Sequence, residues 1–266
     1  MIDLVVEKEN HIMTLTMNRP ARFNALTGAM LIRFYDAYRE ASEDTDVRCI
    51  IVTGAEGNFC SGADLKGMAG DDGDVDKGVD VMARMKEDPD IHWKGMFRGY
   101  RPTKPIIAAV EGVAIAGGTE LLQGMEIRVA GESARFGVSE ARWSLYPMAG
   151  SAVRLPRQIP YTQAAEILLT GKHITAQQAL EIGLIGHVVP DGEALTKARE
   201  IAEVIASNGP LAVEAITRTL HETDGMGLDE ALAYEFDYGQ AVFASEDSKE
   251  GPKAFAQKRK PNFKRR

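Results

Sequence analysis

Residues 105–123, PIIAAVEGVAIAGGTELLQ, hold the clearest structural pattern in the chain. The apolar run at its start predicts a buried strand that runs into Gly112. A helix is then expected to begin after a second glycine turn at Gly117, with Glu120 in its first turn. Free N–H groups at a helix start favour negative charge, so an oxyanion placed at Gly117 would be stabilised. Glu120 alone has a second interpretation, because acidic residues in first turns are common and mildly stabilising.

Two further glycine turns lie upstream and downstream of this stretch. Residues 59–64, FCSGAD, either supply a second N–H donor at Ala63 or form an ordinary turn in which Asp64 caps a helix. Residues 136–140, FGVSE, lead to Glu140, which is either a surface residue or, beside aromatic side chains, a general acid with a raised pKa. Two carboxylates can carry a proton into and out of one reaction centre. Together these turns predict an enzyme that makes or protonates an enolate.

Composition excludes several other classes of protein. The 266 residues are 44% hydrophobic and carry a formal net charge of -8, which argues against a nucleic-acid scaffold. The basic C-terminal tail, residues 258–266, is either a solvated tail or a site for a phosphate-bearing ligand. The chain has two cysteines, no signal-peptide apolar region, and no run of about 20 apolar residues that could cross a membrane. We therefore expect a cytoplasmic protein with reduced thiols.

Strands alternate with helices in the first part of the chain, which indicates an α/β fold. Apolar runs predict strands at residues 12–17 and 49–52, and a helix is expected to open near Thr27. Thr175 and Gln178 match a capping box at the start of a short helix. Beyond Pro190 the pattern is wholly helical, and Gly and Pro divide it into four helices, near residues 194–207, 210–222, 228–244 and 246–258.

The character of the sequence changes between residues 67 and 104. Four aspartates between residues 71 and 76 predict a mobile polar loop. Trp93, Met96, Phe97 and Tyr100 follow at helical spacing. Such a stripe more often packs in a core than lines a ligand site, although the two interpretations can overlap.

At these motifs the chain resembles the crotonase superfamily, the enoyl-CoA hydratase/isomerase family, over essentially its whole length. The resemblance rests on several motifs in the right order: residues 18–26, 59–66, 108–120, 136–140, 180–184 and 246–263. It implies an α/β spiral of ββα repeats in residues 1–193, which carries the site, and a C-terminal helical trimerisation region in residues 194–266. A homotrimer or a dimer of trimers is the expected assembly.

The resemblance also implies roles for particular residues. In the family, the N–H groups at the positions of Ala63 and Gly117 hold the thioester oxygen, and Glu120 and Glu140 are the catalytic acids. The positions expected to bind the CoA part of the acyl-CoA substrate are Ala21, Arg22, Phe23, Ser61, Ala63, Asp64, Leu65, Lys66, Gly117 and, reaching a neighbouring subunit, Phe255 and Lys258. No metal or separate cofactor is implied.

Because both glutamate positions are filled, we expect an enoyl-CoA hydratase that adds water across a trans-2-enoyl-CoA to give a 3-hydroxyacyl-CoA. A double-bond isomerase or another crotonase-type acyl-CoA reaction is the alternative within the same class. A CoA-thioester-binding protein without turnover and an RNA-associated crotonase are alternatives from another class, and only the basic tail favours RNA. Ser139 stands where hydratases usually have proline, so the pocket beside Glu140 is expected to be reshaped.

Overall fold

A six-stranded sheet forms the centre of the molecule. The computed structural model describes residues 2–70 and 76–266, and the predicted loop at residues 71–75 lies outside them. The sheet has the order β1-β2-β3-β4-β6-β9; β1 and β2 form an antiparallel hairpin and the other neighbours are parallel. Its strands are β1 (Leu4–Glu9), β2 (Ile12–Met17), β3 (Cys49–Gly54), β4 (Ile106–Val110), β6 (Ile127–Gly131) and β9 (His187–Val189).

A smaller sheet is stacked beside the end of the large one. It contains β5 (Val113–Ile115), β7 (Arg135–Gly137) and β8 (Ile174–Thr175), and a parallel bridge between Cys60 and Ala114 extends it to the turn at residues 59–64. Each strand of the large sheet from β3 to β6 is thus followed by a segment of the small sheet and then by a helix. This repeated strand-strand-helix path is the predicted spiral.

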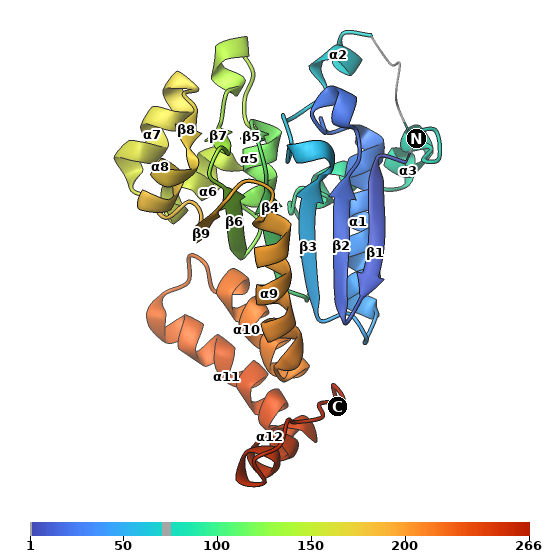
Figure 1. The fold of residues 1–266 in the computed structure, drawn as a ribbon, viewed down its shortest axis with the longest axis vertical. Helices are drawn as coiled ribbons and strands as arrows, with labels where there is room; N and C mark the ends of the chain where they lie inside the picture. Colours follow the sequence, from blue (N-terminus) through green and yellow to red (C-terminus); the bar gives the residue numbers. More distant parts are fainter. Residues whose placement is uncertain (1, 71–75) are drawn as a thin grey trace.

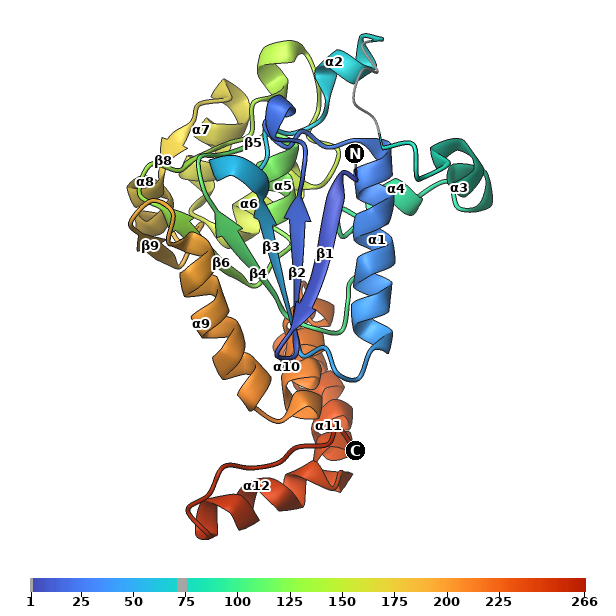
Figure 2. The same ribbon diagram turned by 45° about the vertical axis from the view of Figure 1, so that its right-hand side comes forward.

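Helices cover both faces of the large sheet (Figures 1 and 2). Helix α1 (Gly28–Glu43) lies on one face, with Phe34 and Tyr38 fully buried in the main core. Helix α9 (Ala194–Ser207) packs on the other through three alanines, Ala194, Ala198 and Ala202. Small side chains allow close approach to β4, whose five residues are all buried. The remaining elements are short: η1 (Pro20–Arg22), η2 (Ala55–Gly57), α2 (Leu65–Met68), α3 (Val81–Glu87), α4 (Ile91–Lys94), α5 (Gly117–Leu122), η3 (Glu140–Trp143), α6 (Ser151–Gln158), α7 (Tyr161–Thr170) and α8 (Ala176–Glu181).

Local signals place most helix ends correctly. Thr27 caps α1 by accepting a hydrogen bond from the Met30 amide, and the predicted capping box between Thr175 and Gln178 is present. The helical interpretation of residues 93–100 is wrong beyond Lys94. Helix α4 ends there, and Phe97 adopts a φ of 60°. Its ring lies against Gly124 and stacks on Tyr38, so tertiary packing outweighs the helical spacing.

The last three helices extend away from the sheets, α10 (Pro210–Glu222), α11 (Leu228–Ala244) and α12 (Asp247–Ala256) (Figures 1 and 2). Buried charges hold their base to the core: Lys104, 1% exposed, pairs with Glu214 of α10, which also accepts from Arg265 at 2.8 Å. Helix α9 belongs with the sheet by its packing, and the predicted boundary between residues 193 and 194 stays a prediction. Across the described ranges, no helix is long and apolar enough to span a bilayer.

Candidate active site

The small sheet brings three turns together at one edge. Cys60, Ala114 and Phe136 are neighbours across parallel pairings. The residues that follow each of them therefore emerge side by side, because parallel strands end at the same edge. The turn after Cys60 carries Ala63, the turn after Ala114 carries Gly117, and the turn after Phe136 carries Glu140. Segments far apart in the sequence thus meet in one place.

The amides of Ala63 and Gly117 lie next to each other. A methyl group built on Gly117 would be 3.5 Å from the Ala63 nitrogen, and one built on Gly62 would be 3.0 Å from the Gly117 nitrogen. Leu26 donates to the Gly62 carbonyl at 2.8 Å and accepts from the Asp64 amide at 3.0 Å. In this parallel pairing the intervening Ala63 amide faces away from Leu26.

Backbone strain aims the second amide. Ala116 has φ 51° and ψ -122°, a conformation that is costly for a residue with a side chain. Its amide is anchored to the Gly137 carbonyl at 2.7 Å, and α5 begins at the next residue. Gly117 therefore occupies the first position of a helix, where its N–H has no intrahelical acceptor. Two amides without helix or bridge acceptors, held close together, form a site for a developing oxyanion.

Glu120 projects from α5 and is buried, with 4% of its surface exposed. Its Oε1 accepts a hydrogen bond from the Ser151 amide, at the start of α6, at 3.0 Å. Burial raises the pKa of Glu120, while the amide hydrogen bonds and the charge of Arg154 oppose that rise. The mildly stabilising first-turn role is therefore incomplete as an explanation, because a buried carboxylate has a desolvation cost that a surface residue avoids.

Glu140 opens η3 and faces Glu120. Burial first, and then the charge of Glu120, raise the pKa of Glu140 to about 7. The Oε2 atom of Glu140 is buried and has no donor as a hydrogen-bond partner among the described residues. The two carboxyl groups are within hydrogen-bond reach, so a bond forms when Glu140 is protonated and donates to ionised Glu120. Trp143, which follows it in the sequence, is 68% exposed, so burial and the neighbouring acid, rather than that ring, cause the shift.

Glutamine at position 140 should change how stability depends on pH. The pKa of Glu140 rises from an ordinary value of 4.5 to about 7 on folding, so the folded state holds this proton more tightly. Its stabilising contribution is full below pH 4.5 and is lost as pH rises to about 7. Urea unfolding from pH 4 to 8 should therefore show Glu140→Gln gaining stability relative to the parent as pH rises. Parallel pH curves for the two proteins would contradict the shifted pKa.

Both acids and both amides face one cavity of about 660 Å³. Its wall is mostly apolar and includes Leu26, Met68, Met85, Trp93, Met96, Leu145, Tyr146 and Met148. Trp93 and Met96 thus line the ligand site, while Phe97 is in the core, and the two interpretations of that stripe each hold for part of it. Residues 67–68 and several residues between positions 81 and 96 supply part of this wall.

The residues predicted to bind CoA in the first part of the chain, between positions 21 and 66, lie around the turn that lines this cavity. The Ser61 amide donates to the Phe23 carbonyl at 3.0 Å, and its hydroxyl donates to the Arg22 carbonyl at 3.3 Å. The segment that begins at Ala21 therefore lies against the turn that carries Ala63. Leu65, which lines the cavity, and Lys66 follow in α2 and are exposed, as residues that meet a ligand from solvent would be.

Asp64 caps a helix, which was the simpler interpretation of its turn, and it also lines the cavity. It caps α2 through the Gly67 amide at 3.0 Å and pairs with Arg19 at 2.8 Å. Arg19 is only 5% exposed and also donates to the Ala25 carbonyl. Sequence reasoning missed this arginine and treated it as part of a turn. Its position before Pro20, in a motif that was quoted for the resemblance, was the available signal.

Two predicted residues do not join the site of their own chain. Phe255 lies on α12 and is 87% exposed, and Lys258 follows that helix. Figures 1 and 2 show α12 at the end of the molecule opposite α2. Within one chain these residues do not line the cavity, and the role expected for them at a neighbouring subunit stays a prediction.

A strand-strand-helix spiral with paired amides and two facing carboxyls defines the crotonase class of protein. The family described as "Enoyl-CoA hydratase/isomerase" matches residues 7–266, and the chain is a member of that family. It is 56% identical to "Enoyl-CoA hydratase EchA19" of Mycobacterium tuberculosis, with 99% of this chain and 97% of that one covered. It is 36% identical to "2,3-dehydroadipyl-CoA hydratase" of Escherichia coli over the full length of both.

Solved structures agree with the fold. An enoyl-CoA hydratase from Bacillus anthracis superposes with a TM-score of 0.89 at 34% identity, covering 99% of this chain and all of that one. An enoyl-CoA hydratase from Mycobacterium tuberculosis gives a TM-score of 0.86 at 37% identity, with both chains fully covered. The predicted α/β spiral and the predicted family are confirmed.

Proposed function

We propose that this chain is an enoyl-CoA hydratase that adds water reversibly across a trans-2-enoyl-CoA. The observation that carries the proposal is the convergence of Glu120, Glu140 and the amides of Ala63 and Gly117 on one cavity. Two relatives that match essentially the whole chain are named as hydratases, which supports the same activity. The proposed chemistry uses only protein groups and the thioester, with no cofactor beyond the CoA of the substrate.

The geometry suggests how the protons move. Glu120, ionised beside protonated Glu140, accepts a proton from the water that attacks C3. Electron density shifts to the thioester oxygen, where the amides of Ala63 and Gly117 stabilise it. Glu140 then gives its proton to C2. Because the two carboxyl groups are in hydrogen-bond reach, the proton on Glu120 can return to Glu140 and restore the starting state.

Crotonyl-CoA and longer, branched or ring-bearing enoyl-CoAs provide the test. Hydration removes the conjugated double bond, so the ultraviolet absorbance of the enoyl thioester should fall with each turnover. A 3-enoyl-CoA should react slowly in the same assay, because its double bond is not conjugated with the thioester. An isomerase would instead convert it to the conjugated isomer, and the absorbance would rise. Rapid isomerisation with little water addition would overturn the proposed reaction in favour of the alternative.

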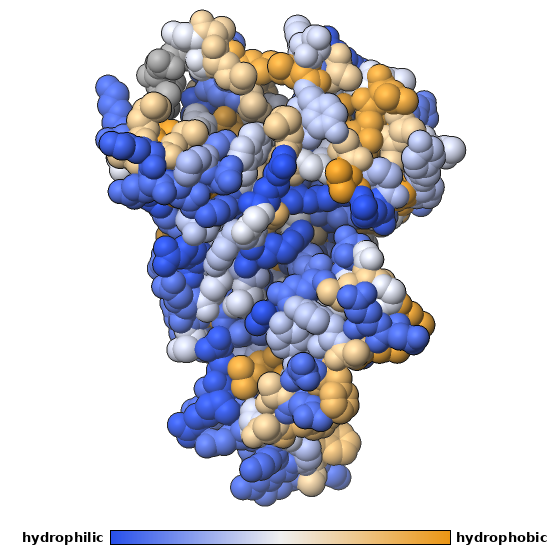
Figure 3. Space-filling model, turned by 180° about the vertical axis from the view of Figure 1, so that it is seen from behind, coloured by the Kyte–Doolittle hydropathy of each residue, from blue (hydrophilic) through white to orange (hydrophobic). Residues whose placement is uncertain are grey.

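The exposed apolar face on the last helices fits the proposed homotrimer or dimer of trimers. Helices α10 and α11 form a groove of about 550 Å³ lined by Ile216, Leu220, Phe236 and Phe243. Three of these side chains are more than 61% exposed, and Figure 3 shows apolar residues on this protruding part. Isolated apolar patches of this kind mark association surfaces. A second copy of the chain is the proposed occupant.

Lys258→Ala should raise KM for crotonyl-CoA a few-fold with little change in kcat. In the proposed assembly this side chain meets the CoA of a neighbouring subunit, where an exposed charge pair contributes up to about 1 kcal/mol. Initial rates at varied crotonyl-CoA concentration measure the effect. Lys249→Ala on the preceding helix is the matched control and should leave KM unchanged. An equal rise in both variants would contradict a specific contact.

A further inference from the structure

A second cavity lies between the core and the end of helix α10. Its volume is about 810 Å³, and its wall comes from the end of α5, from α6, from the loop before β9 and from the end of α10. Its lining residues and those of the catalytic cavity are different. Figure 3 shows hydrophilic residues across the middle of the rear face, above the protruding helices.

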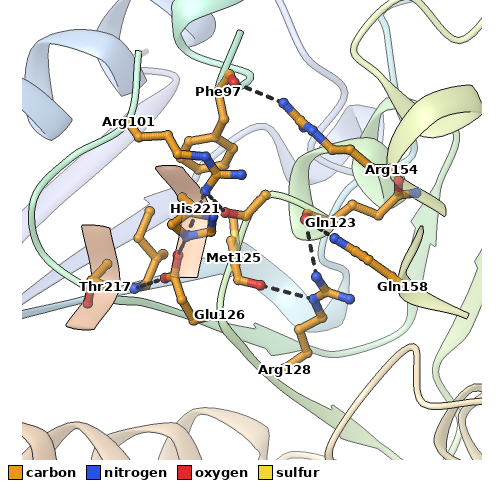
Figure 4. A network of polar contacts seen from close by, with 12 residues as sticks. Phe97, Arg101, Gln123, Met125, Glu126, Arg128, Arg154, Gln158, Thr217 and His221 are labelled. Carbon is orange, nitrogen blue, oxygen red and sulfur yellow. Dashed lines mark hydrogen bonds and ion pairs between the residues drawn. The ribbon is translucent and has the colours of Figure 1, made fainter. Parts of the chain in front are cut away.

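Arginine is the dominant charged residue of this wall. Four arginines and two carboxylates line it: Arg101, Arg128, Arg154, Arg157, Glu126 and Asp224. Four positive charges against two negative ones leave an excess of two when the histidines are neutral. Glu126 is already engaged, because it accepts from the Ile106 amide at 2.6 Å and contacts His221. Figure 4 shows the side chain of His221 beside that of Glu126.

Arg128 and Arg154 have no carboxylate as a hydrogen-bond partner within the described part of the chain. Arg128 donates to the carbonyls of Gln123, Met125 and Leu184, at 2.9 to 3.1 Å. Arg154 donates to the carbonyls of Met96 and Phe97 (Figure 4). Carbonyl dipoles orient a guanidinium without supplying a full negative charge, so the carboxylates of Glu126 and Glu120 offset the charges of Arg128 and Arg154 only through space.

The charges also repel one another. Burial is the main cause that lowers the pKa of Arg128 and of Arg154 to about 10, and Arg101 contributes to both shifts. Arg157 is exposed at the rim and donates only to the Val153 carbonyl of its own helix. It is therefore available to a molecule that enters from solvent. The wall thus combines two fixed, partly buried arginines with one free to close on a ligand.

Guanidinium groups recognise phosphate by paired N–H donors, and a divalent phosphate matches an excess of two positive charges. We propose that this arginine-lined cavity binds a small phosphate-bearing anion. The site is separate from the catalytic cavity, because no residue lines both, and none of the residues assigned to the CoA path lines the arginine-rich one. Binding here requires neither of the catalytic glutamates, so its test does not depend on the proposed hydratase activity.

Calorimetric titration of the full chain with inorganic phosphate tests the site. Sodium chloride keeps the ionic strength constant, and saturating acetyl-CoA occupies the CoA path. We expect saturable binding of one phosphate per chain. Arg157→Glu should weaken it at least about tenfold, because one charge-assisted contact is lost and a repulsive one is gained. Gly186→Asp should do the same by adding an acid to the wall; its side chain has room, with the nearest atom 3.9 Å from the new Cβ.

Arg135→Glu is the matched control. Arg135 is exposed and lies outside this cavity, and its side chain donates only to the carbonyls of residues 133 and 134. Reversing the charge of Arg135 should leave the phosphate affinity unchanged, which distinguishes a local site from a general charge effect. Thermal melting verifies that each variant is folded. No saturable binding to the parent, or equal affinity in the parent, Arg157→Glu and Gly186→Asp, would overturn the proposal.

Discussion

Glu120→Gln should lower kcat for hydration of crotonyl-CoA by about 10²- to 10⁴-fold, the range for loss of one general acid–base group. The fold should be retained, because the amide oxygen of glutamine can still accept the 3.0 Å hydrogen bond from Ser151. The substitution removes the ability to take a proton from water, together with the negative charge that helps to raise the pKa of Glu140. KM should change little, since the acyl thioester is held by backbone amides and by the apolar wall.

Stopped-flow or steady-state absorbance measures this effect, and Glu132→Gln is its control. Glu132 is exposed in the turn between β6 and β7 and lies outside the catalytic cavity. The same change of charge there should leave kcat within about twofold, as expected for a surface substitution away from the site. The double variant of Glu120 and Glu140 should lose less than the product of the single losses, because the two acids act as a unit. Full activity in Glu120→Gln would exclude the proposed base.

Sequence reasoning located the regular elements well where the signal was local. The strand at Ile12–Met17 and the helix ends at Thr27 and Thr175 depend on apolar period and on capping side chains, and both are properties of neighbouring residues. The helical prediction for the stripe that begins at Trp93 was wrong beyond Lys94 for the opposite reason. There Phe97 packs against Gly124 and Tyr38, and no neighbouring residue encodes those contacts.

The same difference between local signals and contacts of distant segments applies to the site. Glycine turns could be recognised, and the family resemblance assigned Glu120 and Glu140, but the contact between the two carboxyls arises only from strand pairing in the small sheet. Arg19 was missed because its acidic partner Asp64 lies 45 positions away. The second cavity could not be predicted at all. Its arginines come from three separate parts of the chain, the segment at Arg101, strand β6 and helix α6, and share no motif.

Gly62→Ala should lower kcat by about 10²- to 10³-fold, the typical effect of losing one oxyanion donor. Gly62 has φ 99°, and a methyl group there would lie 2.8 Å from the Cβ of Ala116 and 3.0 Å from the Gly117 nitrogen. The contact with the Cβ of Ala116 is closer than Cβ atoms come in folded proteins, so the two turns must separate. The amides of Ala63 and Gly117 would then no longer converge on one oxygen, although both glutamates stay in place.

Gly57→Ala is the control that distinguishes backbone strain alone from displacement of the two amides. Gly57 also has a positive φ, of 74°, but a methyl group there meets nothing within 4 Å. Both variants should therefore lose stability by about 1 kcal/mol from the unfavourable φ. Only Gly62→Ala should lose kcat, which kinetics at matched fractions of folded protein can measure. Since catalysis here depends on the distance between two backbone groups, equal kcat in the two variants would mean that the amides do not hold the thioester oxygen.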